Sequence, residues 1–202
     1  MRNELVLGFS EDSLPFGSHA CFYYSDEASL KATLAFLRTG LDAPRDFCVI
    51  FADVSRHEGL VEWLQDGYAG DVRELLAAGK LVLVGGAPTV EPLVAGIKEA
   101  LDGAIAQGYE AIRFLGFIAW GQEGWPDDVS LLEFESAVNK VVTSYPAVII
   151  CTYGVPRLKG QTLLYGGLET HPIIFLNDLT VQGNPFYVRP ETSDAARRSA
   201  TD

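Results

Sequence analysis

The chain has 202 residues, of which 48% are hydrophobic and 11% aromatic, enough to bury the core of one domain, and a second folded domain is not expected. Its formal net charge of −12 argues against binding to nucleic acid or to an acidic membrane surface, since no run of Lys and Arg offsets it. Three cysteines indicate reduced thiols in a cytoplasmic protein, and neither a signal peptide nor a membrane span is recognisable.

The first predicted element is a short apolar strand that starts at His19 and runs into an acidic helix start. In an α/β protein this first strand-to-helix turn commonly binds the ligand, because backbone N–H groups and the positive end of the helix dipole meet there. A phosphate loop needs G-x-x-x-x-G-K-[ST]. Here no glycine lies between Tyr23 and Lys31, and Asp26 and Glu27 stand where an anion would bind. ATP is therefore not the expected ligand.

Strand and helix patterns then alternate along the chain. The turn leads into a helix with leucines at helical spacing and with Ser25 or Asp26 as its N-cap. Continuous apolar runs typical of strands covered on both faces follow at 47–52, 80–84, 111–115 and 147–152. Helical patterns occupy 56–78, as two short helices broken near residues 67–70, and then 93–105, 130–143 and 159–170.

This alternation predicts an α/β fold with a mostly parallel, right-handed sheet and helices on both of its faces. Residues 173–176 and 186–188 are predicted to be short closing strands. The polar tail at 191–202 lacks periodicity and is expected to be disordered, which leaves one domain over residues 1–190. The irregular segment 116–128, rich in glycine and carrying Trp120 and Trp125, could fold over a pocket as a lid.

The cysteines and the first histidine are the first candidates for chemistry. His19 and Cys21 lie two residues apart on one strand and therefore point to the same side, which makes a shared pocket feasible. Zinc sites generally contain close pairs such as C-x-x-C, which Cys21, Cys48 and Cys151 do not form, so no metal site is predicted. The alternative is that the thiols are small core residues and His19 a hydrogen-bonded residue at the strand start.

Glu135 is the second candidate, because the helical wheel places it among apolar residues rather than on the solvent side. A carboxylate in an apolar arc needs a partner or must stay protonated. It could cap a neighbouring backbone or pair with an arginine such as Arg113, or it could hold a polar group of a ligand. Both interpretations remain open.

Several other residues have positions that suit either function or structure. Trp120 and Trp125 are a plug over the core or walls of a ligand site. Tyr153 and Arg157 follow the fifth strand at its carboxyl end, where open α/β sheets place their sites. His171, before a proline, is interpreted as a helix-end residue that favours the dipole. We find no catalytic motif such as G-x-S-x-G or H-E-x-x-H, so an enzyme is not expected.

Several of these motifs together resemble the MEDS domain, the sensory domain of methanogen and methylotroph regulators of the dichloromethane-repressor type. The resemblance extends over about residues 15–191, and each of its motifs is weak alone. It rests on His19-Ala20-Cys21-Phe22-Tyr23, Trp120, Glu135 with Asn139, 146–153, His171-Pro172 and 184–188.

The resemblance implies a three-layer domain related to the RecA and KaiC ATPase core that has lost its phosphate loop and senses ligands. The implied strand order puts the fifth strand beside the first, so Cys151 could approach His19 and Cys21. One departure is Gly116-Phe117-Ile118-Ala119-Trp120, where family members often have Gly-Glu-x-x-Trp. If that Glu contacts the ligand, the pocket of this chain is more apolar or is degenerate.

We therefore expect a non-catalytic sensory module that binds a small molecule, such as an apolar or halogenated hydrocarbon derivative, without a cofactor. The expected partner is a signalling or regulatory protein in transcriptional or signal-transduction control; a homo-oligomer is left open. The alternatives are a degenerate ATPase scaffold for protein association and a thiol or metal redox sensor. The predicted ligand-binding residues are His19, Cys21, Tyr23, Trp120, Glu135, Cys151, Tyr153 and Arg157.

Overall fold

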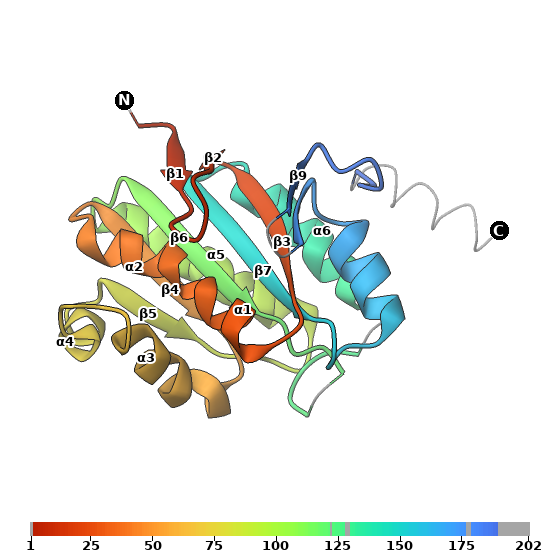
Figure 1. Ribbon diagram of the computed structural model, residues 1–202, viewed down its shortest axis with the longest axis horizontal. Helices are drawn as coiled ribbons and strands as arrows, with labels where there is room; N and C mark the ends of the chain where they lie inside the picture. Colours follow the sequence, from red (N-terminus) through yellow and green to blue (C-terminus); the bar gives the residue numbers. More distant parts are fainter. Residues whose placement is uncertain (1, 122, 128–129, 177–178, 190–202) are drawn as a thin grey trace.

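A seven-stranded sheet forms the middle layer of the protein in the computed structural model, which describes residues 2–189 except 122, 128–129 and 177–178 (Figure 1). The strand order is β5-β4-β6-β7-β3-β8-β9. All neighbouring strands are parallel except β8 and β9, which are antiparallel. The strands are β3 (Ser18–Tyr24), β4 (Asp46–Phe51), β5 (Leu81–Val84), β6 (Ala111–Phe117), β7 (Ala147–Gly154), β8 (Ile173–Leu176) and β9 (Leu179–Gln182). The predicted α/β class is confirmed.

The first strand of the predicted series, β3, lies between two strands from the end of the chain. Cys21 is in register with Cys151 of β7 on one side and with Ile174 of β8 on the other. This confirms the expected pairing of the first and fifth strands. Because side chains alternate along a strand, His19, Cys21 and Tyr23 point to the same face of the sheet.

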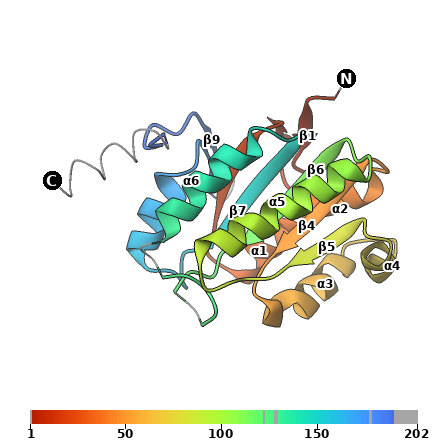
Figure 2. The ribbon, with the colours of Figure 1, turned by 180° about the vertical axis from the view of Figure 1, so that it is seen from behind.

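Helices cover both faces of the sheet, as the front and back views show (Figures 1 and 2). The first face carries α1 (Glu27–Ala32), α2 (Leu34–Asp42), α3 (His57–Gln65), α4 (Val72–Ala77) and the 3₁₀ turn η1 (Val54–Arg56). The second face carries α5 (Val90–Ala106), α6 (Leu131–Val142) and the π-helical segment η2 (Thr162–Leu168). Each face has its own apolar core. Within the described residues, no helix combines the length and the apolar character that crossing a membrane requires.

A buried ion pair under α2 rules out one of the partners considered for Glu135. The Arg113 Nε donates to Asp46 Oδ2 at 2.8 Å, and its Nη1 donates to the carbonyl oxygens of Val6 and Phe36. Arg113 is in register with Cys48 and Val148, which belong to the first core, whereas Glu135 lies in α6 on the opposite face. Pairing of Glu135 with Arg113 is therefore wrong.

The predicted first helix is divided into α1 and α2 at Thr33, whose hydroxyl donates to the Leu30 carbonyl. Asp26, rather than Ser25, is its N-cap: the carboxylate accepts the Ser29 backbone N–H at 2.7 Å. This carboxylate occupies the position at the helix start where a phosphate would accept hydrogen bonds.

The ends of the chain depart most from the sequence predictions. A two-stranded antiparallel ladder, β1 (Glu4–Val6) with β2 (Ser13–Pro15), was not predicted, since each strand has only three residues. Residues 186–188 are not a strand; the strand that pairs with β8 is β9. The Asn184 side chain accepts the Phe186 N–H and so holds this segment as a turn. The predicted tail at 191–202 lies outside the described residues.

Candidate functional site

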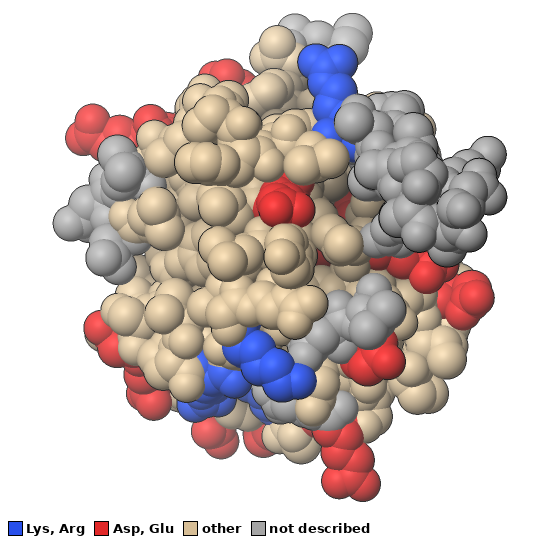
Figure 3. Space-filling view, turned by 90° about the vertical axis from the view of Figure 1, so that its right-hand side faces the viewer, with Lys and Arg blue, Asp and Glu red and all other residues tan. Residues whose placement is uncertain are grey.

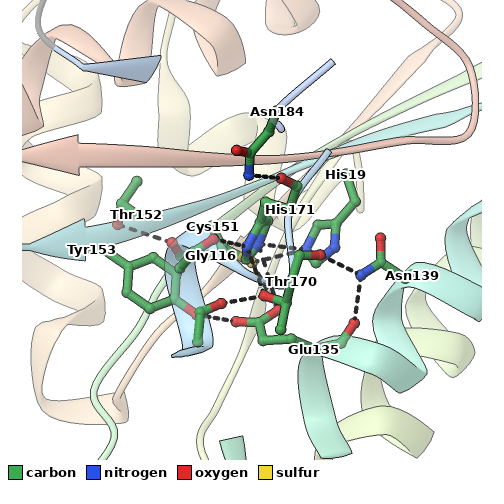
Figure 4. A network of polar contacts seen from close by, with 12 residues as sticks. His19, Gly116, Glu135, Asn139, Cys151, Thr152, Tyr153, Thr170, His171 and Asn184 are labelled. Carbon is green, nitrogen blue, oxygen red and sulfur yellow. Dashed lines mark hydrogen bonds and ion pairs between the residues drawn. The ribbon is translucent and has the colours of Figure 1, made fainter. Parts of the chain in front are cut away.

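Four polar side chains from four separate elements converge between the sheet and the helices of its second face (Figure 4). His19 comes from β3, Cys151 from β7, Glu135 from α6, and His171 follows η2. None of the four side chains is more than 2% exposed. We call these four residues the polar cluster.

The donor atoms of the polar cluster face one another at short range. The His19 Nε2 lies 3.1 Å from His171 Nε2, 3.3 Å from Cys151 Sγ and 3.4 Å from Glu135 Oε2. The Glu135 Oε2 lies 3.6 Å from His171 Nε2 and 3.9 Å from Cys151 Sγ. All four donor atoms are within 4.8 Å of one another.

The orientation of His171 is fixed by the end of η2. Its Nδ1 lies 2.8 Å from the Gly167 carbonyl oxygen. Because a carbonyl oxygen can only accept, Nδ1 carries the proton, and the lone pair of Nε2 in the neutral ring points into the cluster. Thr170 supports this geometry, since its hydroxyl is 2.9 Å from the same Nδ1 and also contacts the Gly166 carbonyl.

Two glycines let η2 approach the sheet and α6 closely enough to deliver His171. A Cβ on Gly166 would lie 2.6 Å from Leu131 Cγ, and one on Gly167 would lie 2.8 Å from Tyr23 Cζ. Real Cβ atoms do not make such short contacts, so larger residues would push η2 outward. The Gly166-Gly167 pair therefore sets the position of the imidazole.

Glu135 accepts hydrogen bonds at its side-chain carboxyl group and at its backbone carbonyl. The Tyr153 hydroxyl donates to Glu135 Oε1. One turn along α6, the Asn139 side-chain amide donates to the Glu135 carbonyl oxygen at 3.1 Å and to the Thr170 carbonyl oxygen at 2.6 Å. Asn139 therefore joins α6 to the segment that carries His171.

Burial decides the charge state of the polar cluster. Loss of solvation raises the pKa of Glu135 to about 8, although hydrogen bonds from Tyr153 and Cys151 oppose the shift. Burial also lowers the pKa of His171 to about 4 and lowers that of His19, which the neighbouring His171 depresses further. The pKa of Cys151 is raised by burial and by Glu135. At neutral pH each group therefore favours its uncharged form.

Six of the eight residues predicted to bind a ligand meet in or beside the polar cluster. His19, Glu135 and Cys151 belong to it. Tyr153 hydrogen-bonds to it, and Cys21 and Tyr23 lie on the same face of β3.

The other two predicted residues lie farther out. The Trp120 ring packs on Phe134, the neighbour of Glu135, with centroids 4.9 Å apart, and its buried Nε1 has no hydrogen-bond partner among the described residues. Arg157 instead lines a surface recess of about 250 Å³ at the carboxyl ends of β3 and β7. Its other walls include Tyr24, Asp26, Arg56 and Trp63.

Sequence reasoning missed His171 as a member of the polar cluster. The prediction of a helix-end residue placed it correctly after η2, but the ring is buried and faces His19 rather than solvent. The sequence did not show that β8 pairs with β3: Ile173, two residues after His171, is in register with Ala20. Pairing β8 beside β3 brings His171 next to His19.

The predicted lid segment covers the carboxyl ends of β4 and β5. Residues 117–120 and Trp125 are buried. The Trp125 Nε1 donates to Asp53 Oδ2 at 3.2 Å, and its ring lies over Gly86, where a Cβ would come within 2.6 Å of Trp125 Cε2. The described part of the segment thus packs over this edge of the sheet, whereas residues 122 and 128 lie outside the described residues.

Comparisons with known proteins agree with this architecture. A crystal structure of a KaiC-like protein from the hyperthermophilic archaeon Pyrococcus horikoshii OT3 is similar with a TM-score of 0.57 and 15% identity, over 80% of this chain and 72% of that one. This likeness shows the shared RecA/KaiC-like fold. No curated protein sequence matches significantly. The family model of MEDS, the methanogen/methylotroph, DcmR sensory domain, matches residues 18–172, and the chain therefore belongs to the MEDS family of sensory domains.

Proposed function

We propose that this chain is a non-catalytic sensory module that binds a small molecule at the polar cluster and signals through a partner protein in transcriptional or signal-transduction control. Membership in a family of sensory domains supports a sensory role and fits a protein that is not an enzyme. One observation carries the choice of site: four ionisable side chains converge, fully buried, inside an apolar layer.

A buried polar group must be offset by well-formed interactions, and here the polar cluster contrasts with the buried Arg113–Asp46 pair. The Arg113–Asp46 pair has close, directional hydrogen bonds and ties α2 to the sheet, which is a structural role. In the polar cluster, His19 Nε2 faces three groups at once but can form one good hydrogen bond. Such a surplus of converging groups is typical of a binding site.

The surroundings favour a small ligand with a limited polar part. Trp120, Phe134 and Leu131 are buried aromatic or aliphatic residues on the α6 side. Phe117, the position where the resemblance implies Glu, points into the other core, so its side chain does not line the polar cluster. An apolar or halogenated hydrocarbon derivative, oriented by one of the imidazoles or by Glu135, fits this chemistry.

The elements that hold the polar cluster also offer a route to the surface. Glu135 and Asn139 belong to α6, and the Gly167 carbonyl binds His171, so a ligand that displaces these groups shifts α6 and η2 against β3 and β7. On its outer side η2 exposes Leu164 and Tyr165, by 53% and 44%. Figure 3 looks onto this side of the molecule, and its centre is mostly uncharged. A mostly uncharged area on an acidic protein suits a protein partner.

A thiol redox sensor is less well supported. All three cysteines are buried. Burial raises the pKa of Cys21 and of Cys151, and raises that of Cys48 to about 12. Reactive sensor thiols are exposed and have lowered pKa values.

Native mass spectrometry of the purified protein, before and after exposure to ATP and to a panel of small halogenated and methylated compounds, tests the proposal. We expect retention of a small molecule by the wild type and by Glu133→Gln, since Glu133 lies in the same helix but is exposed. Retention should be lost in Glu135→Gln. Circular dichroism should show that both variants are folded.

Hydrogen exchange on the same samples tests signalling. A bound compound should change the protection of backbone amides in α6, in η2 and in the lid segment. The wild type and Glu133→Gln should show the same change. A ligand that binds without any change in these elements would contradict a sensory role. No binding of any compound would favour the alternative of a scaffold for protein association.

A further inference from the structure

The donor atoms of the polar cluster are spaced as the ligands of one metal ion are. A tetrahedral zinc site has bonds of about 2.0–2.1 Å to nitrogen and oxygen and about 2.3 Å to sulfur, which puts its ligand atoms about 3.3–3.8 Å apart. The separations from His19 Nε2 are 3.1 Å, 3.3 Å and 3.4 Å, and those from Glu135 Oε2 to the other two groups are 3.6 Å and 3.9 Å, which brackets this range. The remaining pair, His171 Nε2 and Cys151 Sγ, lies within 4.8 Å. The four ligand atoms come from separate parts of the fold and all lie within 4.8 Å of one another, as one ion would require.

The hydrogen bonds around His171 and Glu135 leave an acceptor atom of each facing the centre of the polar cluster, as metal ligands require. His171 must keep its proton on Nδ1, because that atom faces the Gly167 carbonyl. A carbonyl on the outer nitrogen and a lone pair on the inner one is the arrangement that metal-binding histidines adopt. Glu135 has the corresponding outer support, since Tyr153 donates to Oε1 and leaves Oε2 facing the centre.

The charges of the four ligands and of a divalent ion would also sum to zero, which suits a site without solvent. Two neutral imidazoles, one thiolate and one carboxylate carry two negative charges, which a divalent cation neutralises. A neutral assembly avoids the cost of a net charge in the interior. The metal itself removes the proton from a coordinating thiol, so the protonated state of Cys151 in the metal-free protein is no obstacle.

We propose that His19, Glu135, Cys151 and His171 bind one divalent transition-metal ion of the zinc class in tetrahedral coordination. Nitrogen and sulfur donors with one carboxylate favour Zn²⁺ or Co²⁺ over Mg²⁺ and Ca²⁺. The ion joins β3, β7, α6 and the end of η2. This inference does not depend on the sensory proposal and requires the same side-chain atoms, because an ion with four protein ligands leaves none of these groups to bind a small molecule.

The test uses metal alone. Protein freed of metal with a chelator is titrated with Zn²⁺ and with Co²⁺ in reducing buffer. Native mass spectrometry should show one ion per chain. The Co²⁺ form should show the intense visible bands of tetrahedral cobalt and a near-ultraviolet thiolate-to-cobalt charge-transfer band.

Matched variants identify the ligands. Cys151→Ser, His171→Gln and Glu135→Gln should each weaken Zn²⁺ binding by about 100-fold or more, beyond the 10- to 100-fold typical for loss of a residue that only orients a ligand. Cys151→Ser should also abolish the charge-transfer band. Cys48→Ser, His57→Gln and Glu133→Gln change the same residue types outside the cluster and should bind as the wild type does. Circular dichroism of the metal-free variants checks folding; Glu135→Gln, which keeps its shape, serves if the others unfold.

Three outcomes would overturn the proposal: no ion bound in excess Zn²⁺, a cobalt spectrum without the thiolate band, or equal binding by the cluster and control variants. Metal bound at the cluster with no response to any small molecule would leave this inference standing and count against the sensory proposal. A small molecule retained by protein that binds no metal would overturn the metal site and support the sensory proposal.

Discussion

At the scale of single residues, Glu135 shows how burial changes the role of a side chain. Its pKa is raised to about 8 by loss of solvation, so the Tyr153 hydroxyl and the neighbouring donors determine how well the carboxyl group is accommodated. A tyrosine that donates to a carboxyl group in the interior should matter far more than the same pair at the surface. The protein contains one pair of each kind: Tyr153 with Glu135 is buried, and Tyr145 with Asp102 is exposed.

We predict that Tyr153→Phe lowers the free energy of unfolding of the metal-free protein by about 1–3 kcal/mol, because the buried Glu135 carboxyl loses its hydroxyl donor. Urea denaturation measures the change. Tyr145→Phe is the matched control: the Tyr145 hydroxyl donates to Asp102 at 2.6 Å, but this pair is exposed to solvent. It should change stability by less than about 0.5 kcal/mol. Equal effects of both substitutions would show that burial of Glu135 is not the source of the energy.

Some residues of the polar cluster could be predicted from the sequence, and one could not. Glu135 was predictable because a carboxylate in an apolar helical arc breaks the pattern. His19 and Cys151 were expected to be close because the family resemblance implied that the first and fifth strands are neighbours. His171 was not visible by residue type, since its partner is 152 positions away. Whether an imidazole after a helix faces solvent or the core depends on which strand follows it.

At the scale of elements, α2 is held against the sheet by Arg113, and a glycine makes room for this contact. A Cβ on Gly40 would lie 2.9 Å from Arg113 Nε and 2.7 Å from Cys48 Sγ. The guanidinium cannot move away easily, because Asp46 and two carbonyl oxygens hold it. The steric clash of an alanine Cβ with Arg113 and Cys48 therefore outweighs the usual gain in helix propensity from glycine to alanine.

We predict that Gly40→Ala destabilises the protein by about 1–3 kcal/mol through overpacking. Gly103→Ala in α5 is the control, because nothing lies within 4 Å of a Cβ there. It should stabilise the protein by up to about 1 kcal/mol, the difference in helix propensity. Thermal or urea unfolding measures both variants, and a stabilising Gly40→Ala would contradict the packing described here.

Long apolar runs made the central elements predictable, whereas short ones failed. The strands β3 to β7 have mostly hydrophobic sequence, with exceptions such as His19 in β3 and Arg113 in β6. The three-residue strands β1 and β2 give too little pattern, although Leu5 and Leu14 are fully buried. In 186–188, the apolar residues suggested a strand, but the Asn184 side chain bonds to the backbone and holds a turn instead.

At the scale of the whole molecule, the charge is strongly unbalanced, with 27 Asp and Glu against 15 Lys and Arg. The ion pairs Lys31–Glu27, Arg45–Glu110, Arg73–Glu58 and Lys98–Asp102 are exposed, and exposed pairs contribute little to stability. Repulsion among the remaining carboxylates should therefore dominate the dependence of stability on salt.

We predict that the melting temperature rises with NaCl between about 0.01 M and 0.15 M, since the screening length falls from about 30 Å to about 8 Å over this range. Differential scanning calorimetry at neutral pH measures the shift. Near the isoelectric pH of about 4.6 the same salt increase should have a smaller effect. A melting temperature that falls with salt at neutral pH would mean that attractive ion pairs outweigh the repulsion.

The place of β3 in the sheet also has a consequence for synthesis on the ribosome. Residues 18–24 are synthesised well before their partners, residues 147–154 and 173–176. A strand that ends buried on both faces must therefore stay unpaired at least until β7 has been made. Such late, long-range pairing folds slowly and exposes apolar sequence meanwhile, so the nascent chain is a natural client for chaperones.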